Sequence, residues 1–270
     1  MDFFVELNNL FSKHRFYPKK GSGMHFVVKK QVLSEVLVLS ELNKSDKVLE
    51  VNAGEFFIAR KLSETTAFLT AFEERKELVL MLEKELPKIN LMPFSFASFS
   101  KKIDANKCVS FLPSGSSGEI FLKLLLTDFD LMVLLLQKDF AEKILALPGF
   151  SEYGFLSVLA DCFFEVKEVI QVKPDSFFPP VSNDFFLIKF SGKKLAGIKN
   201  KKDFSEFLKA LFRFKNRVFV SALTKAIPLM NLDQKTKNKM EERLKEIEFN
   251  EKVYLMESQD FIELFVLLTK

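Results

Sequence analysis

The sequence predicts an α/β fold, in which a mostly parallel, doubly wound sheet is followed by a small basic helical domain. From Val48 onward, short apolar strand-like runs alternate with helical stretches, an order typical of a parallel sheet with helices on both faces. From Asp203 the apolar residues instead recur at i, i+3 and i+4, which is the period of amphipathic helices. We therefore expect a domain of residues 1–190 and a helical domain of residues 191–270.

The elements of the first domain follow in order along the chain. Expected strands and helices alternate as a strand at 47–52, a helix at 56–64, a strand at 66–72, a helix at 74–88, strands at 89–94 and 107–112, a helix at 117–127, a strand at 130–137 and a helix at 138–147. The 130–137 strand lacks polar alternation, as expected for burial on both faces. Two further runs, at 163–172 and 184–190, predict a hairpin on the sheet edge, and 191–197 reads as a linker.

Composition narrows the class of protein. A chain of 270 residues can bury a large core, and its longest apolar run, Leu131–Leu136, is far below the roughly 20 residues of a membrane helix. The first ten residues contain Asp2 and Glu6 but no base, so we expect no signal peptide or presequence. The expectation is a cytoplasmic protein that does not contact membranes.

Cysteine and histidine are scarce. Cys108 and Cys162 both lie in apolar runs and are too few for a disulfide framework, so buried thiols are expected. His14 and His25 are the only histidines, and no metal-ligand spacing surrounds them. We therefore predict no metal.

Charge is distributed unevenly. Residues 191–240 carry 13 Lys and Arg against three Asp and Glu, a net charge of +10, so the rest of the chain is net −6. A second basic segment, residues 7–34, has no acid and contains Lys13, Arg15, Lys19, Lys20, Lys29 and Lys30. Two such basic segments on an otherwise acidic chain are typical of proteins that contact a phosphate backbone, although solvated lysine faces would give the same pattern.

The stretch "VLEVNAGEFF", residues 48–57, carries a weak cofactor signal. A glycine turn after the first strand and an acid closing the second strand are typical of sheets that hold an adenosine-bearing cofactor. Gly54 is the remaining glycine of such a turn, and Glu73 or Glu74 supplies the acid.

A more specific signal is "QKDFAEKILALPGFSEYGFLSV", residues 137–158. It resembles the rRNA adenine dimethyltransferase family, with its Q-x-E-x-A-x-R-x-x-A-x-P-G and Y-G-x-L-S-V patterns at this spacing. Erythromycin-resistance methyltransferases and mitochondrial transcription factor B are relatives of that family. Residues 19–27, 177–190 and 211–223 are similar to its opening, its F-x-P-x-P segment and its basic C-terminal helix, so the resemblance covers roughly residues 16–225.

The resemblance implies a class I methyltransferase fold of Rossmann type, S-adenosylmethionine as cofactor and small-subunit rRNA as partner. This sequence also departs from the family pattern. Asn52 and Phe56 stand at two glycine positions of the first motif, and Phe94 falls at or beside the acid expected after the third strand. The positions that match the family's cofactor residues are His25 and Val27 at the methionine end, Glu50 and Gly54 in the first motif, and Glu73 at the ribose.

The loop "FLPS" matches the family's N-L-P-Y or N-L-P-F, whose Asn and a loop carbonyl accept hydrogen bonds from the adenine amino group. Leu112 and Pro113 are the retained part of this catalytic loop, whereas Phe111 replaces the Asn and Ser114 replaces the stacking aromatic. Losing one preorganised polar contact costs about 10²–10³ in rate, and losing a stacked base costs about 1–3 kcal/mol.

The resemblance also implies RNA contacts, at Lys19, Lys20, Phe177, Arg213, Lys215 and Arg217. The leading hypothesis is a monomeric protein that binds small-subunit rRNA in ribosome biogenesis, with catalysis weak or lost. An active dimethyltransferase and a DNA-binding transcription factor of the mitochondrial type are the alternatives. Two residues also have structural interpretations: Glu73 as an ordinary strand-end carboxylate and Phe177 as a core aromatic.

Overall fold

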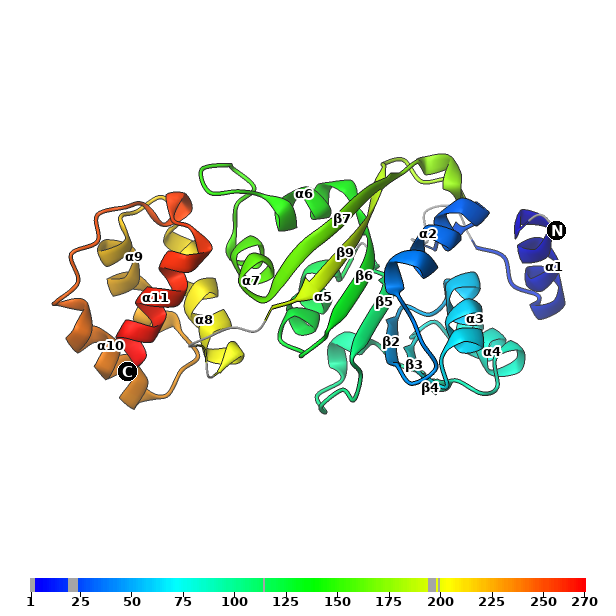
Figure 1. The fold of residues 1–270 in the computed structure, drawn as a ribbon, viewed down its shortest axis with the longest axis horizontal. Helices are drawn as coiled ribbons and strands as arrows, with labels where there is room; N and C mark the ends of the chain where they lie inside the picture. The colour runs from blue at the N-terminus through cyan, green and yellow to red at the C-terminus, as the bar shows by residue number, and fades with distance from the viewer. Residues whose placement is uncertain (1–2, 19–23, 114, 194–197, 199) are drawn as a thin grey trace. The chain divides into compact units, whose positions relative to one another are not determined.

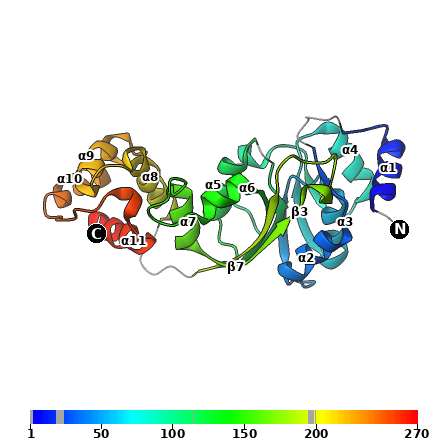
Figure 2. The same cartoon turned by 90° about the horizontal axis from the view of Figure 1, so that it is seen from above.

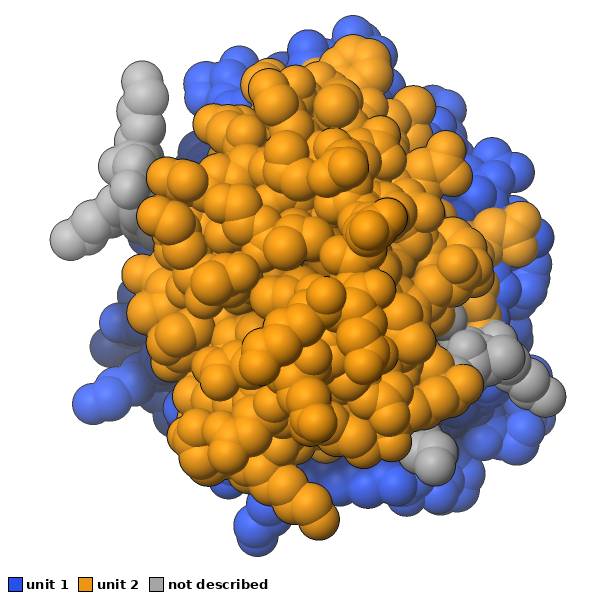
Figure 3. All heavy atoms as spheres, turned by 90° about the vertical axis from the view of Figure 1, so that its left-hand side faces the viewer, with its two compact units in different colours: residues 1–141, 166–192 blue, residues 142–165, 193–270 orange. Residues whose placement is uncertain are grey.

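The structure is a computed structural model that describes residues 3–18, 24–113, 115–193, 198 and 200–270. Its contacts divide the chain into two compact units, coloured separately in Figure 3. Unit 1 comprises Met1–Ala141 and Val166–Gly192, and unit 2 comprises Glu142–Glu165 and Lys193–Lys270. The long segment of unit 2 begins close to the division expected near residue 191. Residues 142–165, which the sequence placed in the first domain, instead pack with the second.

Unit 1 is built on a seven-stranded sheet of order β4-β3-β2-β5-β6-β9-β7 (Figure 1). Strands β4, β3, β2, β5 and β6 run parallel, and β9 pairs antiparallel with β6. The predicted mostly parallel α/β sheet is therefore confirmed, with the two late strands as neighbours at its edge. The strands are β2 (Lys47–Val51), β3 (Phe68–Phe72), β4 (Asn90–Met92), β5 (Lys107–Phe111), β6 (Leu131–Gln137), β7 (Phe164–Val172) and β9 (Phe185–Gly192).

Helices cover the sheet of unit 1 on both faces, with α2 and α3 on one side and α5 on the other in Figure 2. The inner strands carry apolar side chains on both faces for this reason, as the buried pattern of β6 illustrates. The sequence patterns gave no prediction for α1 and α2. The helices are α1 (Phe3–His14), α2 (Lys30–Ser40), α3 (Phe56–Thr65), α4 (Lys76–Glu85), α5 (Ser117–Leu125) and α6 (Lys138–Leu145).

A separate two-stranded pairing joins the N-terminal region to the Pro-rich loop. Strand β1 (Phe26–Val27) pairs antiparallel with β8 (Phe177–Phe178), so Val27 lies opposite Phe177. The backbone N–H of Val28 also donates to the carbonyl of Ser176 at 2.8 Å. Two segments far apart in the chain are thereby held side by side.

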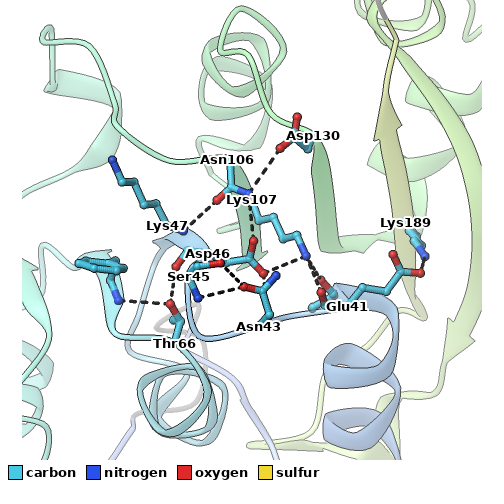
Figure 4. Close-up of polar contacts among 12 residues, drawn as sticks. Glu41, Asn43, Ser45, Asp46, Lys47, Thr66, Asn106, Lys107, Asp130 and Lys189 are labelled. Atoms are coloured by element: carbon cyan, nitrogen blue, oxygen red, sulfur yellow. Dashed lines mark hydrogen bonds and ion pairs between the residues drawn. The ribbon is translucent and has the colours of Figure 1, made fainter.

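A polar network ties together the amino ends of β2 and β5, opposite the strand ends that carry the site (Figure 4). The buried ammonium of Lys107 lies 3.0 Å from Asp46 Oδ2 and donates to the carbonyls of Ser40 and Glu41 at the end of α2. Asn106 Nδ2 donates to the other oxygen of Asp46 at 3.0 Å. Because Lys107 is paired and hydrogen-bonded, its burial is compatible with a stable fold.

Unit 2 is helical, as the i, i+3, i+4 pattern after Asp203 predicts. Asn200 caps the start of α8, where its side chain accepts from the backbone N–H groups of Lys202 and Asp203. Helix α7 was not predicted, because most of its residues are apolar and buried and so show no period. The helices are α7 (Phe155–Phe163), α8 (Lys201–Leu211), η3 (Phe212–Phe214), α9 (Phe219–Ala226), η4 (Ile227–Leu229), α10 (Gln234–Leu244), η5 (Val253–Leu255) and α11 (Ser258–Thr269).

Candidate functional site

The candidate site lies in unit 1 at the carboxyl ends of the parallel strands, where ligands of such sheets bind. The loops after β2, β3 and β5 and the end of β6 converge there. The cavity between them has a volume of about 20 Å³, which is room for about one water molecule. It is lined by His25, Phe26, Asn52, Gly54, Glu55, Arg75, Phe111, Leu112, Pro113, Gln137 and Phe185.

Glu73 follows β3 and its side chain is only 1% exposed. Its Oε2 accepts from the backbone N–H of Gly54 at 2.8 Å, and its Oε1 accepts from the backbone N–H groups of Glu74 and Arg75 at 3.0 and 2.9 Å. The Arg75 guanidinium adds a bidentate contact, with Nε 2.8 Å from Oε1 and Nη2 3.0 Å from Oε2. A carboxylate has about four acceptor sites, so Glu73 is saturated by the protein itself.

Arg75 also links the loop after β3 to the loop after β2. Its Nη2 donates to Asn52 Oδ1 at 2.6 Å, and Asn52 Nδ2 donates to the backbone carbonyl of Phe111 at 3.2 Å. Asn52 has φ = 63°, a left-handed conformation that asparagine tolerates better than most residues. A side chain at this position is therefore accommodated, and Asn52 joins the loops after β2 and β3 to the end of β5.

Gly54 remains a glycine for a reason visible in the protein alone. A Cβ added there would lie 2.3 Å from Leu78 Cδ1 and 2.5 Å from Glu73 Oε2. Phe56, at another glycine position of the motif, begins α3 with its ring buried in the core, and it does not line the cavity. The glycine turn is thus packed against protein atoms.

Two further buried carboxyl groups belong to this region: Glu55 lines the cavity and Glu50 does not. Neither oxygen of Glu50 has a hydrogen-bond partner within the described part of the chain, and burial, then the neighbouring Glu55 and Glu73, raises its pKa well above the ordinary value. Burial also raises the pKa of Glu55 to about 8, although its Oε1 accepts from the Val27 N–H at 2.8 Å. Glu55 is thus mostly protonated at neutral pH, and the rise at Glu50 favours its neutral form too.

The predicted methionine end of the site is also tied to the protein. Val27 is fully buried in β1, and the ring of His25 is held because its Nδ1 donates to the carbonyl of Pro179 at 2.9 Å. Of the five residues that match the family's cofactor positions, His25 and Gly54 line the cavity. Val27, Glu50 and Glu73 are buried behind it.

Aromatic rings close the catalytic loop. The ring centroid of Phe111 lies 5.7 Å from that of Phe177 and 5.2 Å from that of Phe185, and Phe177 and Phe185 are 4.8 Å apart. All three are buried, so Phe177, predicted to contact RNA, is instead a core residue in this structure. Leu112 is also buried, while Pro113 is half-buried, and Ser114 lies outside the described residues.

A family model for "Ribosomal RNA adenine dimethylase" matches residues 15–268 of the chain. The chain belongs to the ribosomal RNA adenine dimethylase family. It is 26% identical over 251 residues to the Ribosomal RNA small subunit methyltransferase A of Clostridium botulinum, which covers 88% of this chain and 90% of that protein. With its Malacoplasma penetrans counterpart it shares 27% identity over 259 residues, 93% of this chain and 95% of that protein.

Solved structures agree on the fold. A dimethyladenosine transferase from Plasmodium falciparum matches with a TM-score of 0.74 at 19% identity, over 88% of this chain and 95% of that one. The 23S rRNA methyltransferase ErmE matches with a TM-score of 0.62 at 18% identity, over 91% and 100%. The predicted class I methyltransferase fold is confirmed, and so is the resemblance to S-adenosylmethionine-dependent rRNA methyltransferases.

The side-chain arrangement does not fit this cofactor, however. A ribose would need free acceptor sites on Glu73, and Gly54 and Arg75 occupy them. The cavity of about 20 Å³ is far below the 300 Å³ or more typical of ligand pockets. Phe94, which falls at or beside the acid that the resemblance leads us to expect, packs its ring against Phe72 and Phe99. The chain thus keeps the family fold and fills the family's cofactor site with its own side chains.

The predicted RNA residues divide into three groups. Lys19 and Lys20 lie outside the described residues. Arg213 and Arg217 are exposed on unit 2. Lys215 is half-buried, and its ammonium donates to the carbonyls of Ser151 and Tyr153 at 2.7 and 3.1 Å, so it holds a loop of unit 2 in place.

Arg75 is the functional residue that the sequence patterns missed. Its sequence signal is weak, since it is simply an arginine two residues after the retained acid. The bridge from Arg75 to Asn52 joins residues on two different loops. Pattern reasoning along one chain segment could not pair them. Among the described residues, no cluster of His, Cys, Asp and Glu side chains is suited to a metal ion. No helix in the same part of the chain is long and apolar enough to cross a membrane.

Proposed function

We propose that this protein binds small-subunit rRNA during ribosome biogenesis and that its methyl transfer from S-adenosylmethionine is weak or lost. The observation that carries the proposal is the closure of the cofactor site, in which Arg75 saturates Glu73 and bridges to Asn52. Phe111 supports it from the catalytic side, because a phenyl ring in a buried aromatic cluster cannot accept a hydrogen bond from an adenine amino group.

The RNA part of the proposal is supported by charge and by the relatives. Matched proteins from several organisms are named small-subunit rRNA methyltransferases. Residues 191–240 keep a net charge of +10, and Arg213 and Arg217 are exposed within them. Such a surface favours a phosphate backbone, whether or not a methyl group is transferred. We further propose that the protein acts as a monomer in the cytoplasm, which light scattering and localisation of a tagged chain would test.

The experiment is isothermal titration of the purified protein with S-adenosylmethionine and with S-adenosylhomocysteine. The expected result is no detectable binding at millimolar ligand. The same preparation should bind a small-subunit 3′-terminal RNA fragment with an affinity that falls steeply with salt. Micromolar binding of either cofactor would refute the loss of the site.

The same preparations separate the two alternatives. Methylation of paired adenines near the small-subunit 3′ end, detected by primer-extension stops only when the protein is present, would establish an active dimethyltransferase. Preference for duplex promoter DNA over structured RNA in a competition assay would establish the transcription factor. Neither result is expected from a closed cofactor site and a basic helical unit.

A further inference from the structure

Unit 2 carries a groove of its own, with a volume of about 500 Å³, which is within the range of ligand-binding sites. The start of α7, the end of α8, η3 and η4 form it. Its lining residues are Phe155, Glu206, Lys209, Ala210, Phe212, Arg213 and Leu229. The groove lies wholly within the helical unit and shares no residue with the candidate cofactor site.

Two aromatic side chains line the groove. Phe155 and Phe212 are both half-buried, and the Phe212 ring packs edge-on against Tyr153 with centroids 5.7 Å apart. The loop before Phe155 is clamped, because Lys215 donates to two of its carbonyls and Tyr153 Oη donates to the carbonyl of Met256 at 2.9 Å. Lys215 therefore positions the loop that leads into Phe155.

Two cations and one carboxylate line the groove, which gives it a net positive charge. Glu206, Lys209 and Arg213 are spaced three and four residues apart, so they share one face of α8 and its continuation. Lys209 and Arg213 are exposed, and across the described ranges neither side chain makes a hydrogen bond or an ion pair. Both cations are thus available to an anion.

We propose that this groove binds a nucleobase of single-stranded RNA, with the base against Phe155 and Phe212 and the neighbouring phosphates on Lys209 and Arg213. The inference rests on the proposed RNA-binding function and names its site. Aromatic platforms beside cations are how proteins hold single strands without reading sequence. In duplex RNA the base faces are stacked inside, so they cannot reach the rings. The net charge of +10 in residues 191–240 complements the strand.

The first test replaces an aromatic that lines the groove. Phe155→Ala in the full chain should weaken binding of a labelled oligoadenylate, measured by fluorescence anisotropy, by about 5- to 150-fold, the range for loss of one stacked base. Phe150→Ala is the matched control, since Phe150 is 61% exposed on the same unit but does not line the groove. It should leave binding unchanged. Equal losses in both variants would overturn the proposal.

The second test replaces an exposed cation, which does not endanger folding. Arg213→Gln should lower the slope of log affinity against log salt by about 0.7, one phosphate contact to a single strand. Lys235→Gln, an exposed lysine on α10, should leave the slope as it is. If the groove variants bind the oligonucleotide as tightly as the parent protein does, the proposal fails. A protein segment would then be the ligand to test in this groove. If the parent protein binds no RNA, the proposed function itself fails.

Discussion

Arg75→Ala tests whether one side chain closes the cofactor site. The substitution removes the two contacts to Glu73 and the contact of Nη2 to Asn52. Breaking a fully buried ion pair costs about 3–5 kcal/mol. Here the cost should be smaller, because Arg75 is 26% exposed and Glu73 keeps its three backbone donors. We expect a loss of about 2 kcal/mol, seen as a fall in Tm of roughly 4–8 °C for a unit of this size.

The decisive assay is ligand binding. Without the guanidinium, Glu73 keeps three backbone donors and gains one free acceptor site, on Oε2, at the strand end where a ribose would bind. Isothermal titration with S-adenosylhomocysteine should therefore detect binding to Arg75→Ala where the parent protein shows none. Arg75→Lys should bind S-adenosylhomocysteine more weakly than Arg75→Ala, because the ammonium retains the charge that pairs with Glu73. It cannot form the bidentate contact, so it replaces the guanidinium only in part.

Arg60→Ala is the matched control for this experiment. Arg60 is 25% exposed, pairs with Glu6 and lies on α3 outside the cavity lining. It should lose stability to a similar degree and gain no ligand. Binding by the parent protein with the affinity of Arg75→Ala would refute the reasoning that Arg75 closes the site. A destabilised Arg75→Ala that still binds nothing would place the block at the aromatic cluster instead.

Three further outcomes are expected. The pKa of Glu55 is raised to about 8, so between about pH 4.5 and 8 the folded state holds a proton that the unfolded state has released. The free energy of unfolding should therefore fall as the pH rises through this window. Glu55→Gln should flatten the decline, as measured by thermal melts at a series of pH values. Lys215→Met should lower the free energy of unfolding by about 1–3 kcal/mol in chemical denaturation, whereas Arg217→Met should cost less than about 0.5 kcal/mol. Phe111→Asn should cost about 3 kcal/mol, by the same measurement, and restore no methyl transfer to rRNA.

The fold was predictable because its signals are local. Each strand from β2 to β6 is an apolar run bounded by turns, and the alternation with helices fixes a parallel sheet. Helix α7 was not predicted, because burial on nearly all sides removes the periodic pattern of apolar residues. Phe177 could be either core or RNA contact in the sequence. Only its pairing with the neighbouring rings assigns it to the core.

Retained motif residues do not by themselves indicate a retained cofactor. Glu73 accepts the N–H of Gly54, and a Cβ at Gly54 would collide with Glu73 and Leu78. Each residue therefore restricts what can replace the other, even with no ligand present. The cofactor motif can persist in this chain because its glycine and its acid hold two loops together. The motif could therefore be kept for its structural contact or for ligand binding, and the Arg75→Ala variant distinguishes the two. The hydrogen bond between Gly54 and Glu73 survives that substitution, whereas the contacts of the Arg75 guanidinium that block the site do not.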